Sequence, residues 1–343
     1  MNTVCSQTGE ELQTTSAGEA DAAACMKPRA ACLGPRQYVY SIHWAPTEDY
    51  LLAGTNAELR LIAADRRAET LKQVAVFTGQ TKISFVRWSA DGKFALSASD
   101  NLALLSVSTH PPKLRELARY DAHDGDVYFV SWSPDGTHAL TAAQSGIVRL
   151  LSVDTAAATL DARAAFVASD GKAFGVAWAP DGRHAMSVAE DGTARLLAVD
   201  FEPPALRELA RITDPEWRSA ISWAPRVEPM VGTWGARNAV QRLTVDLDTR
   251  QLAVREELLW HTSGVDVLEW SHDHTVLLSG GHDDTLRLST EVSGALQTLG
   301  SLRDDGAGVH AASWSTDDAF VAIAASHHDQ VTLLDARSCP RSR

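Results

Sequence analysis

The sequence has few cysteines and no long apolar run. Four cysteines in 343 residues, with no CxxC pair, exclude a disulfide-rich scaffold and predict reduced thiols in a cytoplasmic protein. The first 25 residues have neither the basic nor the apolar region of a signal peptide. No stretch reaches the roughly 18 to 20 apolar residues of a membrane helix. We therefore expect no membrane segment.

Basic residues are scarce and scattered along the chain. There are 31 Lys and Arg residues against 44 Asp and Glu residues, so the net charge is −13, and only six of the basic residues are Lys. An acidic chain without a basic patch repels the phosphates of nucleic acids and of anionic membranes. We expect neither of them among the partners.

Motifs of catalysis and cofactor binding are missing. The sequence contains no P-loop, no GxGxxG after a strand, no GxSxG and no HExxH. Its DG turns lack the alternating Asp residues and the closing Glu of a calcium loop, so turn formation accounts for them. We expect no cofactor and no enzymatic activity.

What the chain does have is a repeat marked by tryptophan. Seven of the ten Trp residues follow an apolar residue two positions earlier and precede Ala or Ser, as in FVSWSPDG. Successive members are 44, 44, 46, 45, 47 and 44 residues apart. They are Trp44, Trp88, Trp132, Trp178, Trp223, Trp270 and Trp314. A period of about 45 residues is typical of a repeat architecture.

Each repeat holds four short segments of alternating polarity. The segment that ends in Trp is followed by ones such as HALTAA, IVRLLSV and LRELARY, with Asp- or Gly-rich turns between them. Such segments are antiparallel strands joined by tight turns. Four strands in about 45 residues form one propeller blade. The predicted fold class is all-β, a seven-bladed β-propeller of four-stranded antiparallel blades.

The segment VSWSPDGTHALTAAQSGIVRLLSVD, residues 130–154, resembles a WD-repeat unit, and the resemblance extends to all seven repeats. The family's Trp-Asp pair is absent from every repeat, and its Gly-His before the innermost strand survives only as His123 and His261. We therefore expect the family's hydrogen-bond network of His, Ser, turn Asp and Trp to be mostly missing. The resemblance implies a rigid ring that binds proteins or peptides.

The two ends of the chain are expected to meet in one blade. Counting from Arg36 to Asp335 leaves the last blade one strand short, and a strand within Pro28–Leu33 would complete it and remove an open sheet edge. Residues 1–28 form an acidic tail that buries too little to become ordered. The propeller is predicted over 29–335 and a C-terminal tail over 336–343.

Histidines crowd the last two repeats. The loops before the innermost strand and before the third strand of each blade share one face, so their His and Asp residues are expected on one rim. This rim comprises His261, His282, Asp283, Asp284, His310, His327, His328 and Asp329. The candidate metal ligands are His282, Asp283, His327, His328 and Asp329. The alternative function is therefore an enzyme or metal-binding protein with a His/Asp site on blades 6 and 7, although exposed loop His and turn Asp are also common without a ligand.

The same face is expected to carry aromatic and arginine side chains. Three Trp residues lie outside the repeat, and Tyr38, Tyr40 and Tyr128 begin innermost strands. The candidate partner-binding residues are Arg36, Tyr38, Tyr128, Trp217, Arg218, Trp234, Arg237 and Trp260. Aromatic residues with Arg are typical interface anchors, although each Trp could instead cover a blade edge or plug the ring. The leading hypothesis is a non-catalytic cytoplasmic scaffold for a protein or peptide, monomeric within a hetero-complex.

Overall fold

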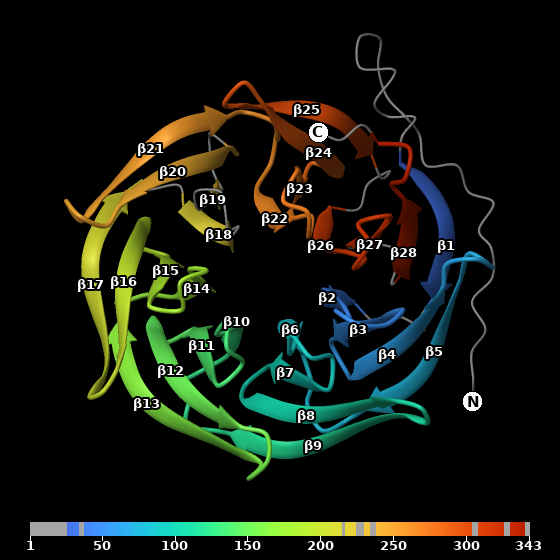
Figure 1. Ribbon diagram of the computed structural model, residues 1–343, viewed down its shortest axis with the longest axis horizontal. Helices are drawn as coiled ribbons and strands as arrows, with labels where there is room; N and C mark the ends of the chain where they lie inside the picture. Colours follow the sequence, from blue (N-terminus) through green and yellow to red (C-terminus); the bar gives the residue numbers. More distant parts are fainter. Residues whose placement is uncertain are drawn as a thin grey trace. The chain divides into compact units, whose positions relative to one another are not determined.

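The structure is a computed structural model that describes residues 26–33, 38–214, 217–223, 230–233, 238–303, 308–325 and 330–339. The regular elements of these residues are β-strands, arranged in antiparallel sheets of four (Figure 1). The chain divides into two compact units. The first unit comprises Met1–Ile83, Ser108–Leu114 and His261–Arg343, and the second comprises Ser84–Val107 and Arg115–Trp260.

The strands follow the repeat of the sequence. Those of the first unit are β1 (Lys27–Leu33), β2 (Val39–Trp44), β3 (Tyr50–Thr55), β4 (Leu59–Asp65), β5 (Thr70–Phe77), β22 (Val265–Trp270), β23 (Val276–Gly281), β24 (Thr285–Val292), β25 (Ala295–Arg303), β26 (Val309–Trp314), β27 (Phe320–Ala325) and β28 (Gln330–Asp335). The remaining ones are β6 (Phe85–Trp88), β7 (Phe94–Ala98), β8 (Leu102–Thr109), β9 (Pro112–Tyr120), β10 (Val127–Trp132), β11 (His138–Ala143), β12 (Ile147–Asp154), β13 (Thr159–Val167), β14 (Ala173–Trp178), β15 (His184–Ala189), β16 (Thr193–Phe201), β17 (Pro204–Thr213), β18 (Trp217–Ser222), β19 (Met230–Thr233), β20 (Val240–Asp246) and β21 (Gln251–Leu258).

The described strands pair in chain order, with one exception. Six sheets consist of four consecutive strands each, from β2–β5 to β22–β25, and a further sheet has the order β1-β28-β27-β26. In that sheet β1 lies antiparallel to β28, with Lys27 opposite Asp335 and Leu33 opposite Gln330 (Figure 1). The predicted N-terminal strand is thus confirmed, as is an all-β propeller of four-stranded antiparallel blades.

The ends of the chain are tied more firmly than the sequence predicted. Strand β1 begins at Lys27, before the expected boundary at residue 29. After β28, Ala336 and Cys339 pack in the same buried cluster as Met26 and Trp314. Cys339 is disulfide-bonded, so the expectation of reduced thiols is wrong for this cysteine. The predicted acidic tail falls outside the described residues up to residue 25.

Turn chemistry explains the Ser that follows four of the seven repeat Trp residues. In four turns this residue is a Ser whose hydroxyl donates to an Asp two positions later and accepts the backbone N–H five positions on. In one of them Ser271 Oγ lies 2.6 Å from Asp273 Oδ1, and the Val276 N–H donates to Ser271 Oγ at 3.0 Å. The same bonds form at Ser89, Ser133 and Ser315. Because Ser and Asp satisfy the turn locally, the first two strands of a sheet meet in a tight hairpin.

Two of the repeat Trp residues, Trp132 and Trp178, connect neighbouring sheets through hydrogen bonds of their indole N–H groups. In the second unit, the Trp178 indole N–H donates to the Ser131 carbonyl at 3.2 Å, and the Trp132 indole N–H donates to the Arg87 carbonyl at 3.2 Å. Each acceptor precedes the Trp of the preceding sheet, so the repeat spacing sets the contact. Trp314 is 1% exposed, whereas Trp132 is half-buried. The fixed period therefore reflects packing between sheets.

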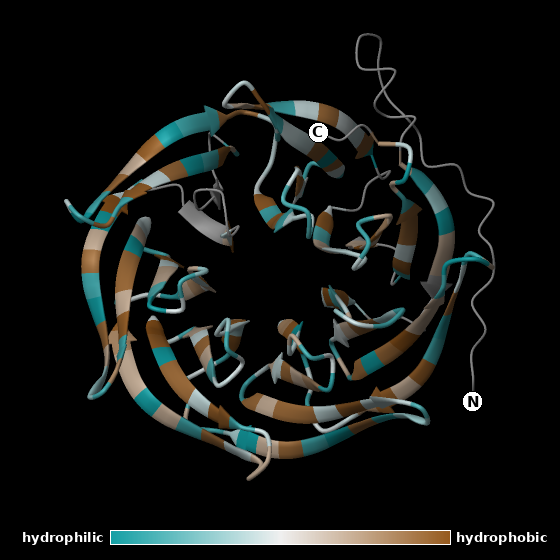
Figure 2. Cartoon of the chain, in the orientation of Figure 1, coloured by the Kyte–Doolittle hydropathy of each residue, from teal (hydrophilic) through white to brown (hydrophobic). Residues whose placement is uncertain are grey.

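The strands differ in polarity according to their position in a sheet. Hydrophobic and hydrophilic residues alternate along outer strands such as β13 and β17 (Figure 2). Second strands such as β11 and β15 are almost wholly buried. This is the pattern of sheets packed on both faces, with only the last strand at an exposed edge. Among the described residues, no helix has the length and hydropathy needed to cross a membrane.

Candidate functional site

Among the described residues, a β-bulge with one extra residue recurs in the innermost strand of five sheets. In β22 the residue Val265 pairs with Gly281 and Val267 pairs with Gly280, so Asp266 is an extra residue between them. The extra residue lies four positions before the repeat Trp each time. We call these the bulge positions, and they are Tyr40, Tyr128, Phe174, Asp266 and His310. Bulges re-aim side chains and are frequent near functional sites.

The bulge positions are half-buried, in contrast to the residues before them. Val39, Val127, Ala173, Val265 and Val309 are all buried, whereas the residue that follows each is partly exposed. In the second unit, the rings of Tyr128 and Phe174 stack with their centroids 6.0 Å apart. In the first unit, Tyr38 lies 4.6 Å from Tyr40 and 5.5 Å from His310, measured between ring centroids. The inner strands thus present aromatic rings and ionisable groups at one structural position.

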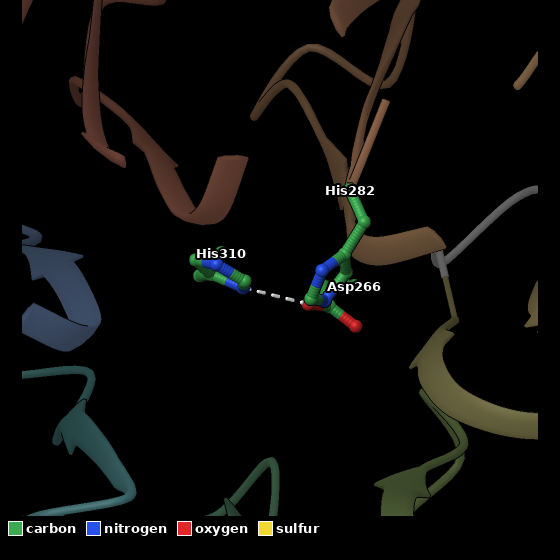
Figure 3. A group of neighbouring side chains, drawn as sticks. All are labelled: Asp266, His282 and His310. Atoms are coloured by element: carbon green, nitrogen blue, oxygen red, sulfur yellow. Dashed lines mark hydrogen bonds and ion pairs between the residues drawn. The ribbon is translucent and has the colours of Figure 1, made fainter. Parts of the chain in front are cut away.

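Two imidazoles converge on one carboxylate in the first unit (Figure 3). Asp266 Oδ2 lies 2.7 Å from His282 Nε2 and 2.8 Å from His310 Nδ1. The two imidazole rings are 4.5 Å apart and nearly perpendicular, at 79°. Asp266 belongs to β22 and His310 to β26, and His282 follows the last residue of β23. The potential ligand atoms of the three side chains all lie within 4.8 Å of one another.

A glycine at position 308 allows the backbone segments of this cluster to approach closely. A Cβ on Gly308 would stand 3.0 Å from the Cα of His282 and 3.6 Å from His310 Nε2. The position six before the repeat Trp is Gly264 in one sheet and Gly308 in the next, whereas Tyr38, Lys82, Asp126, Lys172 and Trp217 occupy it elsewhere. The loop that carries His282 therefore approaches the start of β26 closely because no side chain stands between them.

The charges of the cluster reinforce one another. Burial works to raise the pKa of the Asp266 carboxyl, but the hydrogen bonds from His282 and His310 outweigh it and lower that pKa. The hydrogen bond to Asp266 raises the pKa of His282, and the nearby carboxylates of Asp283 and Asp284 act in the same direction. The site is thus an ionised carboxylate held between two imidazoles in an acidic environment.

Asp283, a predicted metal ligand, has a different set of partners. Its carboxylate accepts hydrogen bonds from His261 Nδ1 at 3.1 Å, from the Thr262 N–H at 2.9 Å and from the Thr285 hydroxyl at 2.7 Å. His261 Nε2 lies 2.9 Å from Ser279 Oγ. The His261 and Asp283 side chains are 0% and 4% exposed. This buried network holds the turn between β23 and β24 and leaves Asp283 little freedom to bind a ligand.

The equivalent network in the sheet β10–β13 is broken. His123, Thr141 and Ser145 stand where His261, Ser279 and Asp283 stand, counted from the repeat Trp. Neither ring nitrogen of His123 has a hydrogen-bond partner within the described part of the chain, and neither does the Thr141 or the Ser145 hydroxyl. His123 is only 7% exposed. Burial, together with the charge of Arg149, lowers the pKa of His123 to about 4. The expectation of a mostly missing network is thus correct for this sheet but wrong for β22–β25, apart from the absent Trp.

The structure describes only some of the predicted site residues. Arg36, Trp234, Arg237, His327, His328 and Asp329 lie outside the described residues, and for Trp217 and Arg218 only the backbone of β18 is described. Trp260 is half-buried beside Leu259, which is 69% exposed. Tyr38, His282 and His310 lie in or beside the cluster of the first unit, whereas Tyr128 belongs to the second.

Sequence reasoning missed Asp266 because it looked for ligands among loop residues. Asp266 is the second residue of a strand, where alternation alone predicts an ordinary strand residue. A signal was nevertheless present four residues before each repeat Trp, where the seven repeats have Tyr40, Ser84, Tyr128, Phe174, Ser219, Asp266 and His310. The residues at this position are large or polar although their neighbours are mostly apolar or small, which indicates that the side chain leaves the core.

The first unit has a second concave region, in which no group of side chains converges on one point as His282 and His310 do on Asp266. It is an open cleft of about 890 Å³ lined by charged residues that include Asp49, Arg66 and Asp317. Arg66 pairs with both acids, and its Nε lies 2.8 Å from Asp49 Oδ1. Because these charges neutralise one another, the cleft presents salt bridges rather than an unsatisfied reactive group.

Comparison with known proteins supports the repeat. The family model described as WD domain, G-beta repeat matches residues 71–105, 114–152 and 254–288. Each matched segment starts in the last strand of one sheet and ends in the third strand of the next. No curated protein matches the chain. A sequence repeat thus starts one strand before its sheet, with the last strand of the preceding sheet. By the same offset, the N-terminal strand β1 is the last strand of the sheet that β26–β28 form.

Proposed function

The chain belongs to the WD-repeat family of β-propellers, and from that premise we propose that it is a non-catalytic scaffold that binds a protein or peptide through its bulge positions. Propellers of this family generally serve as protein-interaction scaffolds. A fold alone does not fix a function, so the proposal depends on the side chains that the bulges present.

The observation that carries the proposal is the partly exposed aromatic pair of the second unit. Tyr128 and Phe174 stand at bulge positions of neighbouring inner strands, stacked and half-buried. Next to Tyr128 in the chain, Phe129 stacks on Phe85 at 3.8 Å, and the Arg87 guanidinium lies 4.6 Å from the centre of the Phe85 ring. Rigid aromatic rings beside Arg are the residues that contribute most to binding energy in protein interfaces.

We further propose that the partner is basic. The chain carries a net charge of −13, and such a field accelerates association with a cationic surface and repels an anionic one. Binding should therefore weaken as salt is raised. This also supports the absence of nucleic acid and membrane lipid from the set of partners.

The remaining parts of the proposal concern assembly. We propose that the six consecutive sheets and the sheet of β1 with β26–β28 close into one ring of seven blades, monomeric within a hetero-complex. The repeat period and the pairing of β1 with β28 support this. The cytoplasmic location stays a prediction, and the disulfide of Cys339 argues against it because such bonds are rare in reducing compartments. Class averages of electron micrographs of the complete protein should show seven lobes.

Further anchors are proposed beyond the bulge positions. Tyr38 lies beside Tyr40 in the first unit, and Trp260 is half-buried next to an exposed Leu. Arg36, Trp217, Arg218, Trp234 and Arg237 complete the proposed partner-binding set on the sequence argument alone.

The test compares two double variants of the full chain. Tyr128→Ala with Phe174→Ala removes the aromatic pair, and Val167→Ala with Val254→Ala removes two exposed apolar side chains on the outer strands β13 and β21, which are 65% and 39% exposed. A partner that co-purifies with the wild-type protein in a fixed ratio should bind the first variant about 30-fold more weakly, as two or more kcal/mol of anchor energy implies.

The control variant should bind like wild type, and both variants should keep the wild-type melting temperature. Equal binding by wild type and the aromatic variant would remove the proposed site. Turnover of a substrate by the purified chain would refute the non-catalytic assignment.

A further inference from the structure

We propose that Asp266, His282 and His310 form a binding site for a divalent transition-metal ion such as Zn²⁺. The structure brings these three side chains together from three strand regions of the first unit. Asp266 and His310 are also bulge positions of the proposed scaffold, but the inference does not depend on the scaffold function because metal binding needs no partner.

The donor set selects the class of ion. Two imidazole nitrogens and one carboxylate oxygen are typical ligands of Zn²⁺ and of neighbouring first-row metals. Ca²⁺ and Mg²⁺ instead require mostly oxygen ligands, which two imidazoles do not supply. Three protein ligands also leave a fourth tetrahedral position for a solvent molecule, and the His282 side chain is 33% exposed, which gives access from outside.

The geometry needs only a small adjustment. Zn²⁺ holds nitrogen and oxygen ligands at about 2.0–2.2 Å, which places two ligands of a tetrahedron about 3.3 Å apart. The distances from Asp266 Oδ2 to the two nitrogens are 2.7 and 2.8 Å. Spreading each pair by about half an ångström through side-chain rotation makes room for the ion. His282 permits this rotation because it follows a strand rather than lying within one.

The backbone of the site is built for close approach. Asp266 and His310 are both bulge residues, so neither is constrained by a paired register position. The absence of a Cβ at Gly308 lets the backbone at His282 come within contact distance. Rigid strands therefore supply two ligands and a close loop supplies the third, as a preorganised metal site requires.

The experiment uses the full chain without an affinity tag, stripped of metal with a chelator that is then removed. Zn²⁺ binding is measured by calorimetry, and bound metal is counted by elemental analysis after dialysis. Wild type should bind one Zn²⁺ per chain. His282→Ala, His310→Ala and Asp266→Asn should each weaken that binding at least tenfold, because loss of a ligand exceeds loss of an outer partner.

The matched control is His272→Ala. His272 Nδ1 lies 2.9 Å from Asp318 Oδ1 in the same unit, so this variant removes a His–Asp pair that is not part of the proposed site. It should bind Zn²⁺ like wild type. Co²⁺ should give the visible absorption of a tetrahedral nitrogen–oxygen site in wild type and in His272→Ala, and not in His282→Ala.

Three outcomes would overturn the proposal. The first is that wild type binds no stoichiometric Zn²⁺. The second is that His272→Ala and His282→Ala lose binding equally. The third is that equimolar Ca²⁺ or Mg²⁺ displaces the Zn²⁺. Circular dichroism checks that each variant is folded. If His310→Ala or Asp266→Asn unfolds, His282→Ala decides the question, because its partly exposed side chain lies outside the strands.

Discussion

Replacing Ser145 with Asp should repair a broken hydrogen-bond network. The sheet β22–β25 shows the intact form, in which Asp283 binds His261, the Thr262 N–H and Thr285. In the sheet β10–β13, Ser145 leaves the buried His123 without a hydrogen-bond partner among the described residues. Ser145→Asp would place a carboxylate beside His123 and near Arg149, whose charge now acts on that imidazole.

The expected change in stability follows from the pKa of His123 and from the hydrogen bond that Asp at position 145 would form with it. A His with a pKa of about 4 in the folded state and about 6.5 in the unfolded chain costs the fold stability as the pH falls through that interval, up to about 3 kcal/mol below pH 4. A charge-assisted hydrogen bond contributes about 1.5–3 kcal/mol, offset by burial of the carboxylate. We expect a net gain of about 1–2 kcal/mol at pH 7.

The pH dependence of the free energy of unfolding should change as well. A carboxylate beside His123 favours the imidazolium and raises the pKa of His123, so Ser145→Asp should no longer lose that stability between pH 6.5 and 4. Urea unfolding at pH 7 and at pH 4 measures the free energy of unfolding of wild type and variant. Proton NMR follows the His123 titration. The control places Ser145→Asp in a His123→Ala background, where the gain should vanish. A gain that persists there, or a loss at both pH values, would refute the reasoning.

Three further outcomes are expected. His261→Ala should destabilise the fold by about 3–5 kcal/mol, because it leaves the buried Asp283 carboxylate without its imidazole. His272→Ala should cost under about 1 kcal/mol, because the His272 side chain is 50% exposed. Equal losses of stability in urea unfolding would contradict this. Trp314→Ala should cost about 3–5 kcal/mol and Trp132→Ala less, since Trp314 is 1% exposed and Trp132 half-buried; calorimetric melting compares them. Thiol titration of the denatured, unreduced protein should find no more than two of the four cysteines, because Cys339 is disulfide-bonded; four reactive thiols would show that the bond is absent.

Local chemistry made the strands readable from the sequence. The apolar residue two before Trp270, the Ser271 that follows it and the Asp273 of the turn each act within a few residues, through alternation and hydrogen bonds that close the hairpin. The need for a strand near Pro28–Leu33 also followed from counting, because a sheet edge must be completed somewhere. These features required no knowledge of which sheets are neighbours.

The site required the tertiary structure. Asp266 and His310 are 44 residues apart, and His282 lies in a turn between them; only the packing of β22 against β26 brings their side chains to one point. Sequence reasoning selected Asp283 rather than Asp266 because it considered the acids of loops, and Asp266 lies within a strand. The folded chain separates them, since Asp283 is directed at the buried His261 and Asp266 leaves the strand at a bulge.

The sequence by itself therefore determined the strand pattern and its hairpin turns, because these depend on residues close in the chain, and the spacing of the repeat Trp residues indicated the period and the family. The tertiary structure alone decided which side chains meet, which His is buried with a partner and which without, and that Cys339 is paired. Those outcomes depend on distances between sheets, and residues that are remote in the chain acquire a common environment only when the sheets pack.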